Sequence, residues 1–261
     1  MTSFVEDSFP CRIKFVTLNV MGPLMWPERS IALTQSLHIM DPDILLLQEL
    51  TPEIIAHLDS HLSHHRRIES DKKCFNTELQ IYYKKNLFNL LDQGASPLEQ
   101  VDYPDRDLCW ARFEVISRPD VKFFVATCHM PWPGCPAELE SGVNQRLLCT
   151  VKVCEHLRRL APRHEAIILA GDFNEAYQPL RMLQEEIGLT CIFEMLDLPP
   201  PITHPMRNSH ISEAGNPDST RDWLTCTFPL GSKAIAAYAQ VPRGPHCVSD
   251  HAAVVGIIEL K

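Results

Sequence analysis

The stretch IILAGDFNE, residues 167–175, runs a short apolar strand into a glycine and then into polar side chains. Asp and Asn after Gly are ordinary turn formers, so a plain turn accounts for this stretch taken alone. Apolar runs of strand length that end on, or start after, polar residues recur along the chain, however: RIKFVTLNV (12–20), ILLLQEL (44–50), VKFFVATC (121–128), RDWLTCTF (221–228) and AAVVGIIEL (252–260). This recurrence predicts several buried strands whose ends carry polar groups.

The order of the elements predicts the fold class. Helical patterns at 29–40, about 141–160 and 179–187 separate some strands, whereas the runs at 109–116 and 121–128 are joined by the turn residues 117–120 as a hairpin. Further strands are expected at 78–85 and 234–241. Such a mixture predicts an α/β fold, a four-layer sandwich of two mixed β-sheets flanked by α-helices. No internal repeat or linker divides the chain, so one domain over residues 1–261 is expected.

Composition limits the possible partners. Hydrophobic residues make up 45% of the 261 residues, which is enough for a sizeable core. The formal net charge of -9 argues against a general nucleic-acid coat, because phosphate binding depends on Lys and Arg. An acidic protein that handles phosphates needs another source of positive charge, and a divalent cation is the obvious one.

Cysteines and the N-terminal residues bear on the compartment. The ten cysteines are scattered without a C-x-x-C pair, so reduced and mostly buried thiols are expected. Glu6 and Asp7 lie where a signal peptide carries basic residues, and no run of about 18 apolar residues is present. A cytoplasmic or nuclear location, without membrane insertion, is therefore expected. The sequence gives no indication of an obligate protein partner.

The polar residues at the strand ends suggest one shared site. Oxygen ligands of this kind suit a hard cation such as Mg²⁺, or alternatively Mn²⁺, better than zinc. Neither a G-x-S-x-G nor a G-x-x-x-x-G-K-[ST] pattern is present, which argues against a serine hydrolase and a P-loop NTPase. Metal-assisted attack of water on a phosphate ester is the remaining chemistry. The residues that carry this prediction are Asn19, Glu49, His129, Asp172, Asn174, Asp222, Ser249, Asp250 and His251.

Each of these residues also has an ordinary structural explanation. Asn19 could cap a strand, Glu49 could be a solvated carboxylate, and lone histidines are usually satisfied structural groups. Only their joint occurrence at strand ends favours a functional site.

The ordered set LNV, LLLQEL, TCHM, LAGDFNE, RDWLTC and VSDHAAV resembles the endonuclease/exonuclease/phosphatase superfamily over nearly the whole chain. GDFN and SDH are the most specific of these motifs. The resemblance implies a metal-dependent phosphodiesterase or nuclease-type hydrolase. The spacing from 28–37 to 43–50 and the NQRL helix most resemble the 5′-tyrosyl-DNA phosphodiesterase branch, which implies a nucleic-acid substrate and a role in DNA repair.

The resemblance also implies a role for each site residue. It makes Glu49 the direct metal ligand and places Asn19 and Asp250 close to the metal. It makes Asp172 the group that orients or deprotonates water, and it makes His251, oriented by Asp222, the stabiliser of the transition state. In the same way, Asn174 and His129 match residues that contact the scissile phosphate.

Two departures from that branch leave the substrate open. CHMPWPG stands where the branch carries a His-Leu-Glu-Ser type sequence, and Phe173 stands where it often has Thr. A phosphatase or phosphodiesterase acting on a small molecule or a lipid headgroup, of the inositol-phosphate or sphingomyelinase type, is therefore the alternative. A catalytically inactive binding module would predict a broken GDxN, QE or SDH motif, and all three are intact.

Four other features have less certain roles. Trp132 could stack on a substrate group or only make a proline-rich loop rigid. Thr203-His204 resembles a Thr-Trp or Thr-His pair of the superfamily and could contact the substrate or only pack. Arg146 could reach the phosphate, although exposure to solvent is commoner for a helical arginine. The cluster His64–Arg67 is read as a solvated charged face.

Overall fold

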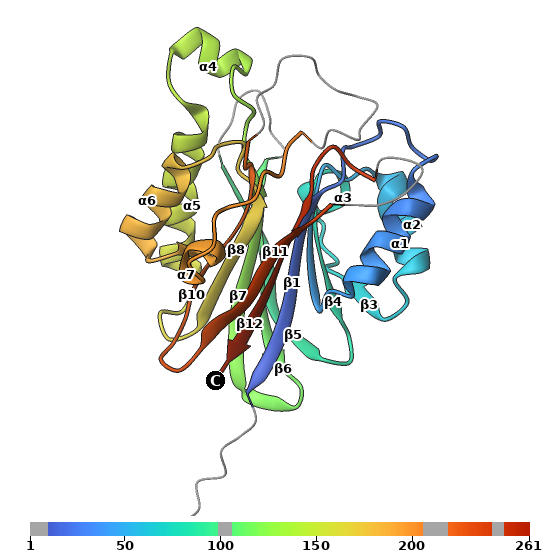
Figure 1. Cartoon of the computed structure of the whole chain (residues 1–261), viewed down its shortest axis with the longest axis vertical. Coiled ribbons are helices and arrows are strands. Elements are labelled where there is room, and N and C mark those ends of the chain that lie inside the picture. The colour runs from blue at the N-terminus through green and yellow to red at the C-terminus, as the bar shows by residue number, and fades with distance from the viewer. Residues whose placement is uncertain (1–9, 99–105, 206–218, 242–247) are drawn as a thin grey trace, which may run out of the picture.

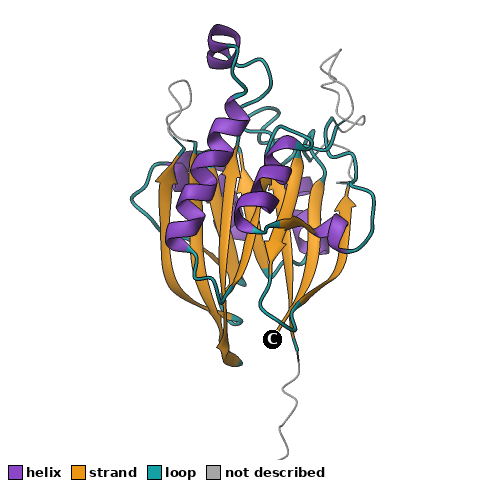
Figure 2. Cartoon of the chain, turned by 90° about the vertical axis from the view of Figure 1, so that its left-hand side faces the viewer, coloured by secondary structure: helices purple, strands orange, loops and turns teal. Residues whose placement is uncertain are grey.

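The computed structural model describes residues 10–98, 106–205, 219–241 and 248–261. Two mixed six-stranded sheets face each other and helices cover their outer faces, which confirms the predicted four-layer α/β sandwich (Figures 1 and 2). The first sheet has the order β11-β12-β1-β2-β4-β3 and the second the order β5-β6-β7-β8-β10-β9. None of the helices in the described ranges combines the length and the hydropathy that a membrane crossing requires.

Strands β5, β6 and β7 follow one another as antiparallel neighbours, whereas helices separate the parallel pairs β1–β2 and β7–β8. The strands are β1 (Cys11–Asn19), β2 (Ile44–Gln48), β3 (His65–Arg67), β4 (Leu79–Lys84), β5 (Phe88–Pro97), β6 (Asp107–Val115), β7 (Arg118–His129), β8 (Ala166–Asp172), β9 (Thr190–Cys191), β10 (Asp222–Thr227), β11 (Lys233–Gln240) and β12 (Ala253–Leu260). The helices are α1 (Ser30–Met40), α2 (Pro52–His61), α3 (Cys74–Thr77), α4 (Pro136–Ser141), α5 (Gln145–Leu160), α6 (Gln178–Ile187) and α7 (Ile192–Met195).

Strand β1 shows why the sheets stack as they do. Its side chains alternate between two apolar layers, since successive residues of a strand point to opposite faces. Phe15 packs into the layer between the sheets, where its ring centroid lies 5.9 Å from that of Phe123 on β7. Val16 and Leu18 belong to the second layer, which contains Leu33 of α1 and Ile54 of α2. The strand is buried on both faces from Phe15 to Asn19, whereas Arg12 and Lys14 near its start are exposed or partly exposed.

Two local predictions need correction. The helix expected at about 141–160 begins at Gln145, because Asn144 caps α5 by accepting from the backbone N–H groups of Arg146 and Leu147. A separate short helix, α4, precedes it and ends at Gly142 in a left-handed conformation. The hairpin turn expected at 117–120 is shorter, because β7 already begins at Arg118.

Candidate active site

Parallel pairing brings the polar strand ends to one end of the sandwich. In β1 and β2 the register places Asn19 beside Gln48, and Glu49 is the first residue after the end of β2. In β7 and β8 it places His129 beside Asp172. Strand β10 runs antiparallel to β8, and Asp222 at its start also pairs with Asp172. Asn19 of the first sheet donates to Asp172 of the second at 3.0 Å, so the two sheets meet at this point.

Residue 171, before Asp172, must be glycine because the backbones of β7 and β8 lie very close together at this point. A Cβ atom on Gly171 would lie 2.0 Å from the backbone oxygen of Cys128 on the neighbouring strand, which excludes any other residue without displacement of β7. Glu49 and Asn174 adopt left-handed conformations, with φ of 59° and 49°, although neither is glycine. Such positions cost about 1–3 kcal/mol and concentrate at functional sites. The GDFN sequence is therefore more than an ordinary turn.

The converging residues line a polar cavity of about 450 Å³. Asn19 and Asp222 lie fully buried behind its wall. The cavity is lined by Glu49, Arg106, His129, Trp132, Pro133, Asp172, Asn174, His204, Arg221, Asp250 and His251.

A second cavity of about 610 Å³ lies on the outer side of the second sheet, beside α6 and α7. Its lining is mainly apolar, with Leu180, Leu189 and Trp223 among its residues. Because catalytic sites bring titratable groups together, the smaller polar cavity is the candidate active site.

Asp172 is the centre of the polar cavity. Its Oδ1 accepts from the backbone N–H of Asn174 at 2.9 Å. Its Oδ2 lies 3.4 Å from Nε2 of His129 and 3.8 Å from Nε2 of His251, besides the bond from Asn19. Burial opposes ionisation, but the two histidines and the hydrogen bonds hold the pKa of Asp172 below its usual value. The carboxyl group is therefore a buried anion that faces two imidazole rings.

His251 is held by a buried carboxylate. Its Nδ1 lies 2.8 Å from Oδ2 of Asp222, which leaves Nε2 directed at the cavity. Burial opposes protonation, but Asp222 and Asp172 raise the pKa of His251 to about 10. Thr203 Oγ1 accepts from the backbone N–H groups of Arg221 and Asp222 at 2.9 and 3.1 Å and so fixes the start of β10. The predicted pairing of Asp222 with His251 is present in the structure.

His129 has a partner that the sequence did not indicate. Its Nδ1 lies 2.7 Å from Oε1 of Glu78, the residue that directly follows α3. Burial opposes ionisation of Glu78, but the hydrogen bond and the charge of His129 lower the pKa of that carboxyl. The Nε2 atom of His129 also lies 3.3 Å from the amide nitrogen of Asn174, whose oxygen lies 3.3 Å from the guanidinium of Arg221.

The three predicted metal-site residues do not all make contact with one another. Asn19 donates from Nδ2 to Glu49 Oε1 at 2.9 Å, and its oxygen accepts from the backbone N–H of Met21. The amide nitrogen, and not the oxygen, thus faces the two carboxylates Glu49 and Asp172. Asp250 also lines the cavity, and its Oδ2 is 3.6 Å from Nε2 of His204. Burial opposes ionisation, but His204 and His251 lower the pKa of Asp250.

The structure also places the less certain residues. Trp132 and His204 line the cavity. Arg146 is buried, not exposed, and its guanidinium pairs with Glu138 at 2.6 Å and with Glu175 at 3.2 Å. In the segment 64–67, His64 and Arg66 are exposed, as a solvated face predicts, whereas Arg67 pairs with Asp59 at 3.0 Å.

Comparison with known proteins identifies the fold. No family model and no curated protein sequence matches the chain significantly. Solved structures do match at low identity. TDP2 of D. rerio complexed with a single-strand DNA product is 18% identical, with a TM-score of 0.75 over 95% of this chain and 98% of that chain. An endonuclease/exonuclease/phosphatase family protein from Bacteroides thetaiotaomicron is also 18% identical, with a TM-score of 0.75 over 97% and 99%.

A third structure carries a different activity in its name. The mannosyl-6-phosphatase Bt3783 of Bacteroides thetaiotaomicron is 18% identical, with a TM-score of 0.72 over 94% of this chain and 99% of that chain. The three similar structures therefore share one architecture. This chain has the fold of the endonuclease/exonuclease/phosphatase superfamily, in agreement with the resemblance seen in its sequence.

Proposed function

We propose that the chain is a divalent-metal-dependent phosphodiesterase that hydrolyses a phosphate ester by attack of an activated water. The observation that carries this proposal is the environment of Asp172. This buried carboxylate stays ionised, touches Asn19, and lies within 4 Å of the Nε2 atoms of two cavity histidines. For Asp172 to act as a general base, one further group must hold the attacking water and another must stabilise the phosphate. The same cavity contains candidates for both.

The donor set fits a hard cation. Glu49 has one oxygen bonded to Asn19, and its side chain is 35% exposed towards the cavity. Carboxylate oxygens with room for waters and substrate are the environment that Mg²⁺ prefers. Glu49 and Asp250 would hold the ion, and Asn19 would position Glu49. Bound Mg²⁺, or Mn²⁺ in its place, would stabilise the negative charge that develops on the phosphate and the leaving oxygen.

The side chains of the protein supply the remaining steps. Asp172 accepts a proton from the attacking water. His251, kept protonated by Asp222, donates from Nε2 to a phosphoryl oxygen. Asn174 and His129 present further polar atoms to the same phosphate, and Arg221 beside Asn174 adds a positive charge.

The preferred substrate is a nucleic acid, of the 5′-tyrosyl-DNA or nuclease type. Arg106 and Arg221 line the cavity beside Trp132, and this combination of cations with an aromatic ring suits a phosphate with an attached base or aromatic leaving group. A similar structure, D. rerio TDP2, carries a single-strand DNA product. A small-molecule or lipid-headgroup ester is the alternative, favoured by the acidic net charge and by the similarity to a mannosyl-6-phosphatase.

A substrate panel tests the proposal. The purified chain is treated with EDTA and then assayed, with and without Mg²⁺ or Mn²⁺, on 5′-phosphotyrosyl DNA, abasic duplex, poly(A) RNA, inositol phosphates and sugar phosphates. Metal-dependent cleavage of at least one substrate is expected. The variant Asp172→Asn is expected to lose about 10²–10⁴-fold in kcat, whereas Asp120→Asn, an exposed change in the β6–β7 region, leaves the rate unchanged.

The outcome of this panel is decisive in either direction. Activity that persists in EDTA, or an Asp172→Asn protein as fast as the wild type, contradicts the mechanism. Tight binding of a phosphate ester without turnover would favour the inactive binding module. Cleavage restricted to sugar or inositol phosphates would favour the small-molecule alternative.

A further inference from the structure

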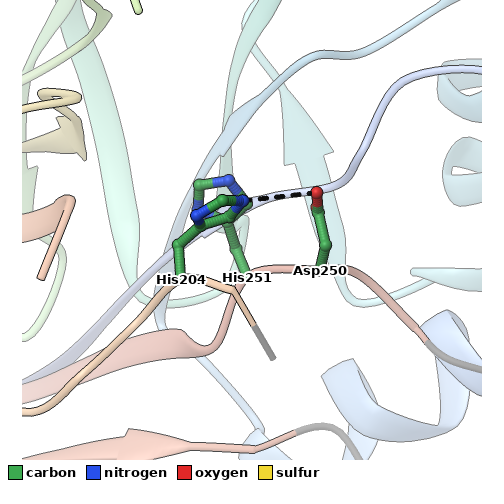
Figure 3. A group of neighbouring side chains, drawn as sticks. All are labelled: His204, Asp250 and His251. Carbon is green, nitrogen blue, oxygen red and sulfur yellow. Dashed lines mark ion pairs between the residues drawn. The ribbon is translucent and has the colours of Figure 1, made fainter. Parts of the chain in front are cut away.

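The cavity wall carries a second group of possible metal ligands, which does not include Glu49. His204, Asp250 and His251 each offer one ligand atom, and these three atoms lie within 4.8 Å of one another. His204 comes from the segment before β10, whereas Asp250 and His251 come from the segment before β12. In Figure 3 the two imidazole rings overlap in the view, and a dashed line marks the ion pair between His204 and Asp250. The ring centroids of His204 and His251 are 4.5 Å apart.

The spacing of these atoms suits coordination of one ion. His204 Nε2 lies 3.6 Å from Asp250 Oδ2. That distance is long for a hydrogen bond. Two ligands that each bind zinc at about 2.0–2.1 Å with tetrahedral angles lie about 3.3 Å apart, so a small closing movement would complete the site. His204 is 95% buried, with a relative exposure of 5%, and its Nδ1 makes no hydrogen bond in the described structure.

His251 is already oriented as a metal ligand. Metal-binding histidines generally donate their second ring nitrogen to a carboxylate, which fixes the tautomer and directs the other nitrogen at the ion. Asp222 plays that part here, at 2.8 Å from Nδ1, and leaves Nε2 for the ion. The Asp222 carboxylate has its other oxygen, Oδ1, buried without a hydrogen bond among the described residues.

The chemistry of the ligands selects the metal. Two imidazoles and one carboxylate suit zinc and other first-row transition metals, whereas Mg²⁺ is held by oxygen ligands. Three protein ligands leave an open position for water, which is the usual composition of an accessible zinc site. We propose that His204, Asp250 and His251 bind Zn²⁺, and that Zn²⁺ bound there inhibits the hydrolase.

Inhibition follows from the identity of the ligands. The proposed function, on which this part of the inference rests, uses Nε2 of His251 for the phosphoryl oxygen and Asp250 for the catalytic cation. Zn²⁺ binding there releases the Nε2 proton of His251, so the ion removes the phosphate donor and occupies one carboxylate together. His204 adds a second imidazole nitrogen to the ligand atoms that Asp250 and His251 supply.

Metal titration of the full chain tests the site without reference to activity. The EDTA-treated protein is titrated with Co²⁺, and the visible absorption of a four- or five-coordinate ion is recorded, followed by displacement with Zn²⁺. One equivalent is expected to bind. His204→Gln and the isosteric Asp250→Asn are expected to weaken Zn²⁺ binding by at least about 100-fold, since loss of an outer-shell partner alone costs 10–100-fold. Thermal melting of both variants confirms that they fold.

Two other histidines serve as controls. His164 is 81% exposed, and His61 stacks on His57 with ring centroids 4.1 Å apart on α2. His164→Gln and His61→Gln are expected to bind Zn²⁺ as the wild type does. The site is refuted if His204→Gln binds Zn²⁺ normally, or if only His61→Gln loses binding.

An inhibition assay separates this inference from the proposed function. The assay uses a substrate that the protein cleaves, with saturating Mg²⁺. For the wild type and each variant, it measures the Zn²⁺ concentration that halves that protein's own rate without Zn²⁺. That concentration is expected to rise at least about 100-fold in His204→Gln, and an unchanged value overturns the inhibitory role. If no substrate is cleaved, the proposed function and the inhibitory role both fail, and the Co²⁺ titration still decides whether the Zn²⁺ site exists.

Discussion

Glu78 Oε1 lies 2.7 Å from Nδ1 of His129, although the two residues are 51 positions apart in the chain. The carboxylate fixes the ring so that Nε2 is directed at Asp172 and Asn174. His129 therefore depends on Glu78 in the way that His251 depends on Asp222. These two carboxylate–histidine pairs each place a histidine Nε2 within 4 Å of Asp172 Oδ2.

Replacement of Glu78 with Gln tests the first pair. The amide removes the charge that holds the His129 ring, so we expect kcat on the cleaved substrate to fall about 10–100-fold. Glu69→Gln, an exposed change close by in sequence, is the matched control and retains the wild-type rate. Equal rates for Glu78→Gln and the control would show that His129 works without its partner.

The second pair is tested by Asp222→Asn. The amide keeps the volume of the side chain but no longer stabilises the charged His251 ring, so the donor to the phosphoryl group is weakened. A loss of about 10²–10⁴-fold in kcat with a smaller change in KM is expected. If KM rises and kcat does not change, Asp222 contributes to substrate binding alone.

Gly171→Ala tests the backbone contact between β7 and β8. The added methyl group would meet the backbone oxygen of Cys128 at 2.0 Å, so the strands must separate at the active-site end. We expect a loss of more than about 3 kcal/mol in the free energy of unfolding, well above the usual effect of a point mutation. Urea denaturation measures it.

Gly188→Ala is the control for the glycine experiment. Gly188 ends α6 with φ of 81°, and a Cβ atom there meets no heavy atom within 4 Å. Its replacement carries only the backbone penalty, about 1 kcal/mol. Similar losses for the two variants would contradict the steric argument at Gly171.

The core strands of the sandwich were predictable because burial leaves a strong pattern. β1, β2, β7, β8 and β12 are apolar runs of strand length bounded by turn residues. β5 was missed, since this edge strand mixes exposed polar residues with Gly94 and Pro97 and has a register shift between Leu90 and Asp92. An edge strand with one unpaired side needs no regular alternation, so its sequence carries little signal.

The site was predictable where a motif lies at a strand end. Asp172, Asn174 and His251 lie in such motifs, and the structure brings them together. Glu78 could not be found in this way, because it follows a four-residue helix and reaches His129 only through the packing of the first sheet against the second. Long-range contacts of this kind leave no local pattern in a single sequence.

Asn19→Asp tests whether the amide separates the carboxylates of Glu49 and Asp172. In the absence of metal, a third carboxylate beside the other two is expected to lower the free energy of unfolding by roughly 1–3 kcal/mol. Mg²⁺ offsets that repulsion, so the rise in Tm on adding Mg²⁺ is expected to be larger in the variant than in the wild type. An equal rise in both proteins would place the cation away from Asn19.

The Arg146 network predicts a loss of stability in acid. Glu138 lies in α4 and accepts two hydrogen bonds from the buried Arg146 guanidinium, which also lies 3.5 Å from the backbone oxygen of Pro131 in the loop before α4. The hydrogen bond from Arg146 lowers the pKa of Glu138 below its usual 4.5. A carboxyl group whose pKa is lower in the folded state stabilises the protein above its unfolded pKa, and this contribution disappears as the pH falls through the folded value.

Glu138→Gln removes this contribution. The free energy of unfolding of the wild type is expected to exceed that of the variant by roughly 1–3 kcal/mol at neutral pH, and the difference is expected to shrink as the pH falls below 4.5 and Glu138 becomes protonated. Urea unfolding at neutral pH and in acid measures the change. The control is Glu185→Gln, which breaks the exposed pair with Arg181 on α6 and should leave the free energy of unfolding nearly unchanged at either pH. A difference between wild type and Glu138→Gln that is the same at both pH values would show that the Glu138 charge does not stabilise this loop.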